Sequence, residues 1–338
     1  MIKPSRLGWV LSALLLLGAR AAAGAGPKIY GFNYPCWGQD CYRTPSAEKN
    51  LDALAQTGAR WVAVVPTWYM TSASESVMKP TNSSPSDDAL RAAIRRAKGL
   101  GLSVELKPHV DRLDGGSRTD LLPPDPAAWF SAYKDMVTHY AEIAARERVD
   151  LFVIGTEFSR LDGPGHRADW LDVIAAVRKI YAGPLTYAAN WDSFSKVGFW
   201  DQLDYVGIDA YFPIPGPESE DNLRRGWRAR KSTLAAAAAG YGKPVIFTEL
   251  GIASQPGANA HPWEDDQDAA VDLNVQKNYL QAFLDTFGDV PWFGGFMLWS
   301  WEVDPHLSGP ENAHYTVQGK PSLDVLETSF ALWNGQAQ

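Results

Sequence analysis

The stretch "VIFTELG", residues 245–251, places a carboxylate at the end of an apolar run. Val245, Ile246 and Phe247 are β-branched or aromatic, a composition typical of a buried strand. Glu249 stands where this strand is expected to end. A lone glutamate at such a place is ordinarily a solvated strand terminus, so its meaning depends on what the rest of the chain puts beside it.

Short apolar runs of this kind alternate with longer helical patterns along the chain, and several of the helical patterns end on glycine. Eight runs are predicted as strands: residues 28–34, 60–66, 102–108, 150–157, 184–190, 204–211, 243–249 and 293–299. Eight strands with helices between them predict a single (β/α)8 barrel, a TIM barrel of the α/β class. A doubly wound open sheet is the alternative fold.

Two long segments follow the sixth and seventh predicted strands, at residues 212–222 and 253–268. In a (β/α)8 barrel these segments lie at the C-terminal face, where the active sites of such enzymes are built. The excess length of the chain is therefore expected around a site.

A second glutamate ends a strand in the same way. Glu157 closes the run "VIGTE" at the fourth predicted strand, as Glu249 closes "VIFTE" at the seventh. The two positions are three βα units apart, at about 30 residues per unit. Both carboxylates are therefore expected to project into one cavity mouth, an arrangement that suits cleavage of a glycosidic bond by two carboxyl groups.

Five motifs in order along this chain resemble glycoside hydrolase family 113, which is known chiefly for β-1,4-mannanases. They are "IGTEFSR" (154–160), "YAANWD" (187–192), "DYVGIDAYFP" (204–213), "GKPVIFTELG" (242–251) and "LWSWE" (298–302). The resemblance runs from about residue 28 to residue 302 and implies a retaining, double-displacement hydrolase of β-1,4-mannan.

Carried over position by position, the resemblance makes Glu157 the acid/base and Glu249 the nucleophile. It places Tyr211 beside the nucleophile and Trp299 under the sugar at the cleavage site. Much of the wider clan of retaining barrel glycosidases has Asn before the acid/base, whereas this chain has Thr156, as family 113 does. The usual Asn contact to the sugar 2-hydroxyl is therefore left unassigned.

Other polar and aromatic side chains follow strand ends and are candidates for substrate binding. Asn190 ends the fifth strand and offers an amide for sugar hydroxyls, or simply forms a turn. Lys107 and His109 follow the third strand, where a cation is suited to bind a sugar hydroxyl and to hold Glu249 ionised; an ordinary loop lysine is the alternative. Indole rings suited to stacking on sugars follow the first, second and fifth strands: Trp37, Trp68 and Trp191. Packing in the core is the alternative for each of these three.

The composition is that of a globular protein, and its acidic charge balance is easier to reconcile with a neutral substrate. The 338 residues are 46% apolar, with 14 Trp, 13 Tyr and 13 Phe, which is ample for a full core. A formal net charge of −8 argues against a nucleic acid partner, because phosphate binding needs a basic surface.

Residues 1–25 resemble a secretory signal peptide. Lys3 and Arg6 precede the apolar run 10–19, and Ala23 and Ala25 end Ala-x-Ala patterns suited to cleavage. We therefore expect a secreted or periplasmic protein in which residues 26–338 form one catalytic domain. It is expected to be monomeric and free of the membrane after signal removal.

Cys36 and Cys41, in "CWGQDC", are expected to form a disulfide in an oxidising compartment, with two free thiols as the alternative. The chain lacks the clustered Cys and His ligands of a zinc site, so no metal is expected. "GPGHRA" (163–168) lacks the preceding strand of a dinucleotide site, so no cofactor is expected.

Three other functions remain open at this level. A glycosidase acting on β-glucan or another β-linked polysaccharide carries the same two glutamates. A lyase that uses Lys107 as a Schiff base explains the lysine but not the matched glutamates. A glycan-binding barrel without catalysis explains the tryptophans alone.

Overall fold

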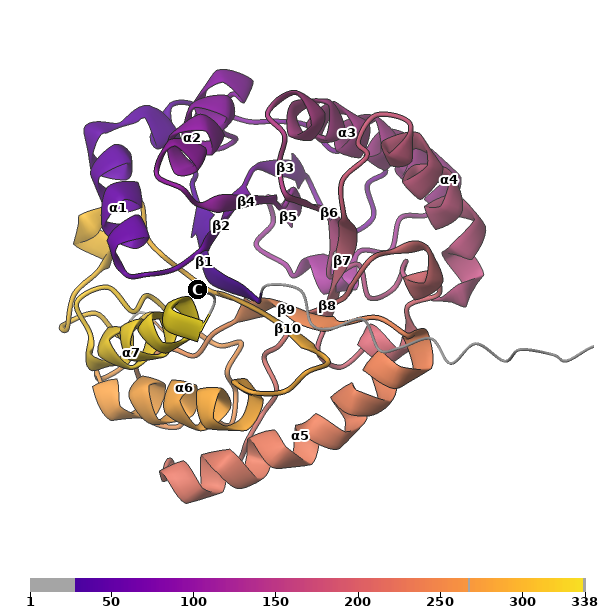
Figure 1. Cartoon of the computed structure of the whole chain (residues 1–338). Helices are drawn as coiled ribbons and strands as arrows, with labels where there is room; N and C mark the ends of the chain where they lie inside the picture. Colours follow the sequence, from indigo (N-terminus) through magenta and orange to yellow (C-terminus); the bar gives the residue numbers. More distant parts are fainter. Residues whose placement is uncertain (1–27, 267, 337–338) are drawn as a thin grey trace, which may run out of the picture.

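The computed structural model of the chain describes residues 28–266 and 268–336. The predicted signal peptide, residues 1–25, lies outside the described residues. The described chain runs through alternating strands and helices that close into a barrel, with the helices on its outside (Figure 1).

Eight parallel strands form the barrel, and each matches one of the predicted runs. They are β1 (Ile29–Pro35), β2 (Trp61–Val65), β4 (Ser103–Leu106), β6 (Leu151–Thr156), β7 (Leu185–Asn190), β8 (Val206–Asp209), β9 (Val245–Leu250) and β10 (Phe293–Leu298). β1 pairs with both β2 and β10, so the sheet has no open edge. The predicted (β/α)8 barrel is confirmed, and the open doubly wound sheet is wrong.

Seven α-helices surround the barrel in the described part of the chain: α1 (Pro45–Gln56), α2 (Asp87–Gly99), α3 (Pro126–Arg146), α4 (Arg167–Arg178), α5 (Glu220–Tyr241), α6 (Leu273–Phe287) and α7 (Pro321–Gln336). Their starts follow local chemistry: at α2, the Ser86 hydroxyl accepts a hydrogen bond from the Ala89 amide. Between β7 and β8 only short 3-10 turns replace the helix. No helix among these residues is long and apolar enough to cross a membrane.

A small second sheet extends one side of the barrel. β3 (Thr67–Met70) follows β2 after one residue, and β5 (His109–Arg112) follows β4 after two. The two strands pair in parallel from Thr67↔His109 to Met70↔Arg112. β3 and β5 thus continue the chain past the C-terminal ends of β2 and β4 and form a separate two-stranded sheet there.

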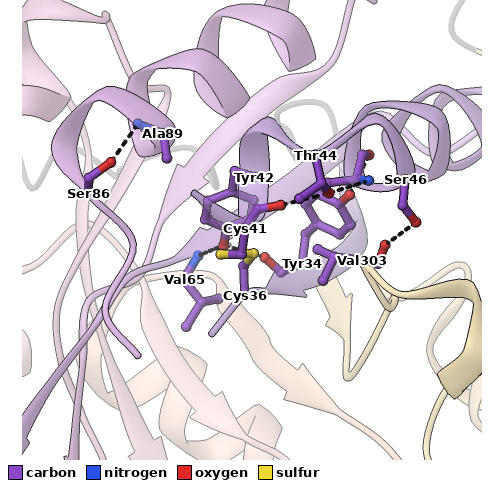
Figure 2. Close-up of a disulfide and its surroundings, with 11 residues drawn as sticks. Tyr34, Cys36, Cys41, Tyr42, Thr44, Ser46, Val65, Ser86, Ala89 and Val303 are labelled. Carbon is purple, nitrogen blue, oxygen red and sulfur yellow. Dashed lines mark hydrogen bonds between the residues drawn. A yellow bond between two sulfur atoms is a disulfide. The ribbon is translucent and has the colours of Figure 1, made fainter. Parts of the chain in front are cut away.

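The loop after β1 is closed by the predicted disulfide between Cys36 and Cys41. Beside it, the Tyr42 hydroxyl donates to the Tyr34 carbonyl oxygen at 2.6 Å and accepts from the Val65 amide at 3.1 Å (Figure 2). This buried tyrosine therefore ties the disulfide loop to the ends of both β1 and β2.

Candidate active site

A cleft of about 660 Å³ opens at the C-terminal ends of the barrel strands. Glu157, directly after β6, and Glu249, the next-to-last residue of β9, both line it. The lining also includes the following residues: Asp111, Gly116, Ser117, Arg118, Thr119, Asn190, Trp191, Asp192, Tyr211, Trp263, Trp299 and Tyr315. The fold thus brings the two glutamates of the sequence pattern into one site.

Glu249 is held by donors on both carboxylate oxygens. The Lys107 ammonium lies 2.5 Å from Oε1, and the Tyr211 hydroxyl donates to Oε2 at 2.6 Å. His109 Nε2 lies 3.7 Å from Oε1. Because its oxygens are fixed from two sides and only 6% of the side chain is exposed, Glu249 has one orientation, toward the cleft.

Lys107 belongs to a buried charge network below the cleft. Its ammonium also lies 3.0 Å from Asp209 Oδ1, and Asp209 accepts a second hydrogen bond from the Thr248 hydroxyl at 2.8 Å. Burial opposes the charged form of Lys107, but the attraction of Asp209, Glu249 and Glu105 outweighs it and raises the Lys107 pKa. Burial raises the pKa of Asp209 to about 7, with the Glu249 charge adding to the shift.

The surroundings of Lys107 are unsuited to a Schiff base. That reaction needs a neutral amine that reaches the substrate, and such lysines have a lowered pKa. The side chain of Lys107 is fully buried, paired with two carboxylates, and has a raised pKa. The lyase alternative therefore has no support in the geometry, in which Lys107 pairs with Glu249 and Asp209.

Glu157 has the opposite surroundings. No side chain among the described residues donates a hydrogen bond within normal distance to its carboxyl group, and Arg118 Nη1 lies 3.6 Å from Oε2. Burial, followed by the negative charge of Asp209, raises the pKa of Glu157 to about 8. Its backbone has a φ of +56°, in the left-handed region that non-glycine residues seldom occupy and that recurs at active sites.

Aromatic rings form two platforms in the cleft. Trp299 follows β10 and stacks on the His109 imidazole, with ring centroids 5.9 Å apart and planes 10° apart. Trp191 stacks on Trp263 at 5.4 Å and 15°, and Trp263 is 44% exposed. Indole faces of this kind stack on the C–H faces of pyranose rings, so both platforms are suited to sugars.

The structure places the other predicted tryptophans elsewhere. Trp68 lies on β3 and lines a separate pocket of about 360 Å³ together with His139 and Tyr140 of α3. The side chain of its neighbour Tyr69 points to the opposite face of β3, because successive side chains of a strand alternate. Trp37 is 50% exposed after β1 and does not line the cleft. Asn190 and Trp191, by contrast, both line it.

The residues of the site that were not predicted from the sequence include Asp111, Arg118, Asp209, Trp263 and Tyr315. Asp209 closes the apolar run "YVGID" just as Glu249 closes its own run, so the same signal was present. Asp111 lies on the short strand β5, Arg118 in a 3-10 turn, and Trp263 and Tyr315 in irregular loops, where no long periodic pattern marks the residues that turn inward.

Glu249, with donors on both oxygens, and Glu157, with a raised pKa, share one tryptophan-lined cleft of a (β/α)8 barrel. This combination is typical of glycoside hydrolases. The sequence pattern of Glycoside Hydrolase Family 113 matches residues 30–320. The chain belongs to this family, as its motifs indicate.

Solved structures agree. A family 113 β-mannanase from Alicyclobacillus acidocaldarius, in complex with ManMIm, is 31% identical, with a TM-score of 0.83 over 90% of this chain and 98% of that one. A family 113 β-1,4-mannanase is 28% identical, with a TM-score of 0.83 over 90% and 99%. A β-glucuronidase from Faecalibacterium prausnitzii, 15% identical with a TM-score of 0.64 over 92% of this chain and 51% of that chain, shares the fold. No curated protein matches the sequence.

Proposed function

We propose that this protein hydrolyses β-1,4-linked mannan or mannooligosaccharides by double displacement, with net retention of configuration. The observation that carries the proposal is the contrast between the two glutamates of the cleft. Glu249 has donors on both oxygens, as a nucleophilic carboxylate needs, and the raised pKa of Glu157 keeps a proton available for donation. The similar solved structures are those of β-mannanases, which supports the choice of substrate.

In the first step, a carboxylate oxygen of Glu249 attacks the anomeric carbon and forms a covalent ester. The glycosidic C–O bond breaks, and Glu157 gives its proton to the departing oxygen. Lys107 and Tyr211 hold Glu249 in line for this attack and share its charge before the bond forms.

In the second step, Glu157, now a carboxylate, takes a proton from water as that water attacks the anomeric carbon. The bond to Glu249 breaks, and the sugar leaves with the configuration it had in the substrate. The buried ammonium of Lys107 then stabilises the carboxylate that Glu249 regains.

The aromatic platforms supply the sugar contacts. Trp299, beside His109, is positioned as the floor under the sugar at the cleavage site, and the Asn190 amide faces the same cleft. Trp191 and Trp263, on loops after β7 and β9, form a further subsite. A cleft of about 660 Å³ with platforms at two places supports binding of more than one sugar unit.

We also propose that the protein is exported and acts as a monomer with one catalytic domain, residues 26–338. The signal pattern in residues 1–25 and the disulfide between Cys36 and Cys41 support export.

A substrate panel tests the proposed activity. The purified protein is incubated with β-1,4-mannan, glucomannan and β-glucans, and product sizes are measured by chromatography. We expect reducing ends and mannooligosaccharides from mannan and cleavage of glucomannan. Preferential release from β-glucan would replace the substrate assignment, and binding without release of sugars would reject catalysis.

A further inference from the structure

The polar side chains of one short stretch, "ELKPHVDR" (105–112), alternate along the wall of the site. Lys107 and His109 both contact Glu249, at 2.5 Å and 3.7 Å. Asp111 is two residues further on, so it shares their face of the strand. Val110, between them, is fully buried on the other side. Asp111 therefore reaches the cleft above the nucleophile, on the side of Glu157.

Asp111 holds Arg118 in place. The Arg118 guanidinium bonds to Asp111 Oδ1 through Nη2, and its Nη1 lies 3.6 Å from Glu157 Oε2. Arg118 lies in the 3-10 turn Arg118–Asp120, and only 16% of its side chain is exposed. A guanidinium presents fixed, planar donors, so pairing with Asp111 through one arm sets the direction of the other.

We propose that Arg118, held by Asp111, is a positioning residue that sets the orientation and the acidity of Glu157. This proposal rests on the proposed function, because it assumes that Glu157 is the acid/base. Arg118 acts on the proton donor as Lys107 and Tyr211 act on the nucleophile, and no other cationic side chain among the described residues lies within 4 Å of the Glu157 carboxyl.

The charges that face Glu157 come from four separate segments of the chain and have opposing effects. Burial and the negative charges of Asp209 on β8 and Glu249 on β9 favour the protonated form of Glu157. Arg118 and, less strongly, Lys107 favour the carboxylate. Arg118 thus makes Glu157 a stronger acid for the first step and stabilises the carboxylate that this step leaves behind.

The test compares pH profiles of kcat/KM for Arg118→Met and Arg118→Lys on phenyl β-mannobioside. Without the positive charge, we expect the alkaline limb of Arg118→Met to move up by about one pH unit and kcat/KM at neutral pH to fall about tenfold. Arg118→Lys keeps the charge and is expected to keep the limb near its original position.

The matched control is Arg160→Met. Arg160 also has a carboxylate, Asp120, at 3.6 Å, but its side chain is 54% exposed and does not line the cleft. We expect its profile to be unchanged. On 2,4-dinitrophenyl β-mannobioside, whose leaving group needs no proton, Arg118→Met is expected to keep its kcat/KM.

If Arg118 has only a structural role, Arg118→Met should lose the same fraction of its activity on both substrates, and the alkaline limb of its pH profile should stay in place. That result for Arg118→Met, at an unchanged Tm, would overturn the proposal. Glu157→Gln in the same assays separates the two hypotheses. If Glu157→Gln retains its alkaline limb and its activity on the phenyl substrate, the acid/base assignment itself fails, whatever Arg118 does.

Discussion

Glu157 and Glu249 end similar runs of sequence and are distinguished by their neighbours. Glu249 accepts hydrogen bonds from the buried Lys107 ammonium and the Tyr211 hydroxyl. Glu157 has no such donors among the described residues, and its burial together with the negative charge of Asp209 raises its pKa. The proposed roles of acid/base and nucleophile therefore rest on residues from other parts of the chain, and single substitutions are expected to separate the two roles.

Alanine variants of the two glutamates are expected to fail at different steps. Glu249→Ala should abolish turnover of every mannoside. Glu157→Ala should retain the first step for substrates with good leaving groups, because these need no proton. Azide should then rescue Glu157→Ala and give a β-mannosyl azide, identified by NMR. Rescue of Glu249→Ala to the β-azide instead would reverse the assignment.

Trp299→Ala tests whether this ring orients the sugar. Trp299 lines the cleft and stacks on His109, so its loss should lower kcat as well as weaken binding, while Tm changes little. A tryptophan serving only the core costs about 3–5 kcal/mol of stability when truncated. A collapsed Tm with normal kcat in the folded fraction would remove Trp299 from the site.

At the scale of elements, the periodic pattern predicted each of the eight barrel strands, because buried strands in a parallel sheet are continuous apolar runs. The pattern missed β3 and β5. Each is four residues long and follows a barrel strand after a proline, and "HVDR" carries three polar residues. Short strands of this composition have no apolar run to mark them, yet β5 carries His109 and Asp111 to the site.

Most of the predicted site residues lie at or just after strand ends, although Asp209, which ends β8, was missed. Glu157, Glu249, Tyr211, Asn190 and Trp299 follow from strand ends that converge on one barrel face. Arg118 and Trp263 reach the same cleft through irregular segments whose path depends on tertiary contacts, such as the Arg118–Asp111 pair. Trp68 has the right position along the chain, but the alternation of β3 turns it toward α3.

Close packing of β1 against β2 depends on Gly31. A Cβ at this position would lie 1.8 Å from the Trp61 carbonyl oxygen, which belongs to the backbone of the neighbouring strand. Gly31→Ala should therefore lower the free energy of unfolding by about 1–3 kcal/mol or more. Gly99→Ala is the control, since nothing lies within 4 Å of the added Cβ in α2. Its denaturation midpoint should stay unchanged or rise slightly, and equal losses for both variants would contradict this account.

For the whole molecule, the buried carboxyl groups link stability to pH. Glu105, inside the barrel, has no hydrogen-bond partner for either carboxyl oxygen among the described residues. Burial raises its pKa to about 8, against 4.5 for an ordinary glutamate. A group whose pKa is raised in the folded state favours folding while protonated, so this contribution is present below pH 4.5 and is lost as pH rises to about 8.

We therefore expect the Tm of the parent protein to fall between about pH 5 and pH 8, and Glu105→Gln, which stays neutral, to reduce that slope. Glu75→Gln, a change at an exposed site, should leave the slope as it is. Calorimetry over this pH range measures both. A Glu105→Gln variant that folds normally and has the parent slope would show that Glu105 does not titrate in this range.

The central claim is that the whole molecule acts as a retaining glycosidase, and the anomeric form of the first product tests this claim most directly. Hydrolysis of a β-1,4-mannooligosaccharide is followed by ¹H NMR within the first minutes, before mutarotation mixes the anomers. Two displacements at the anomeric carbon, by Glu249 and then by water, predict that the β-anomer of the new reducing end appears first. Initial appearance of the α-anomer would mean a single displacement by water and would contradict the role given to Glu249.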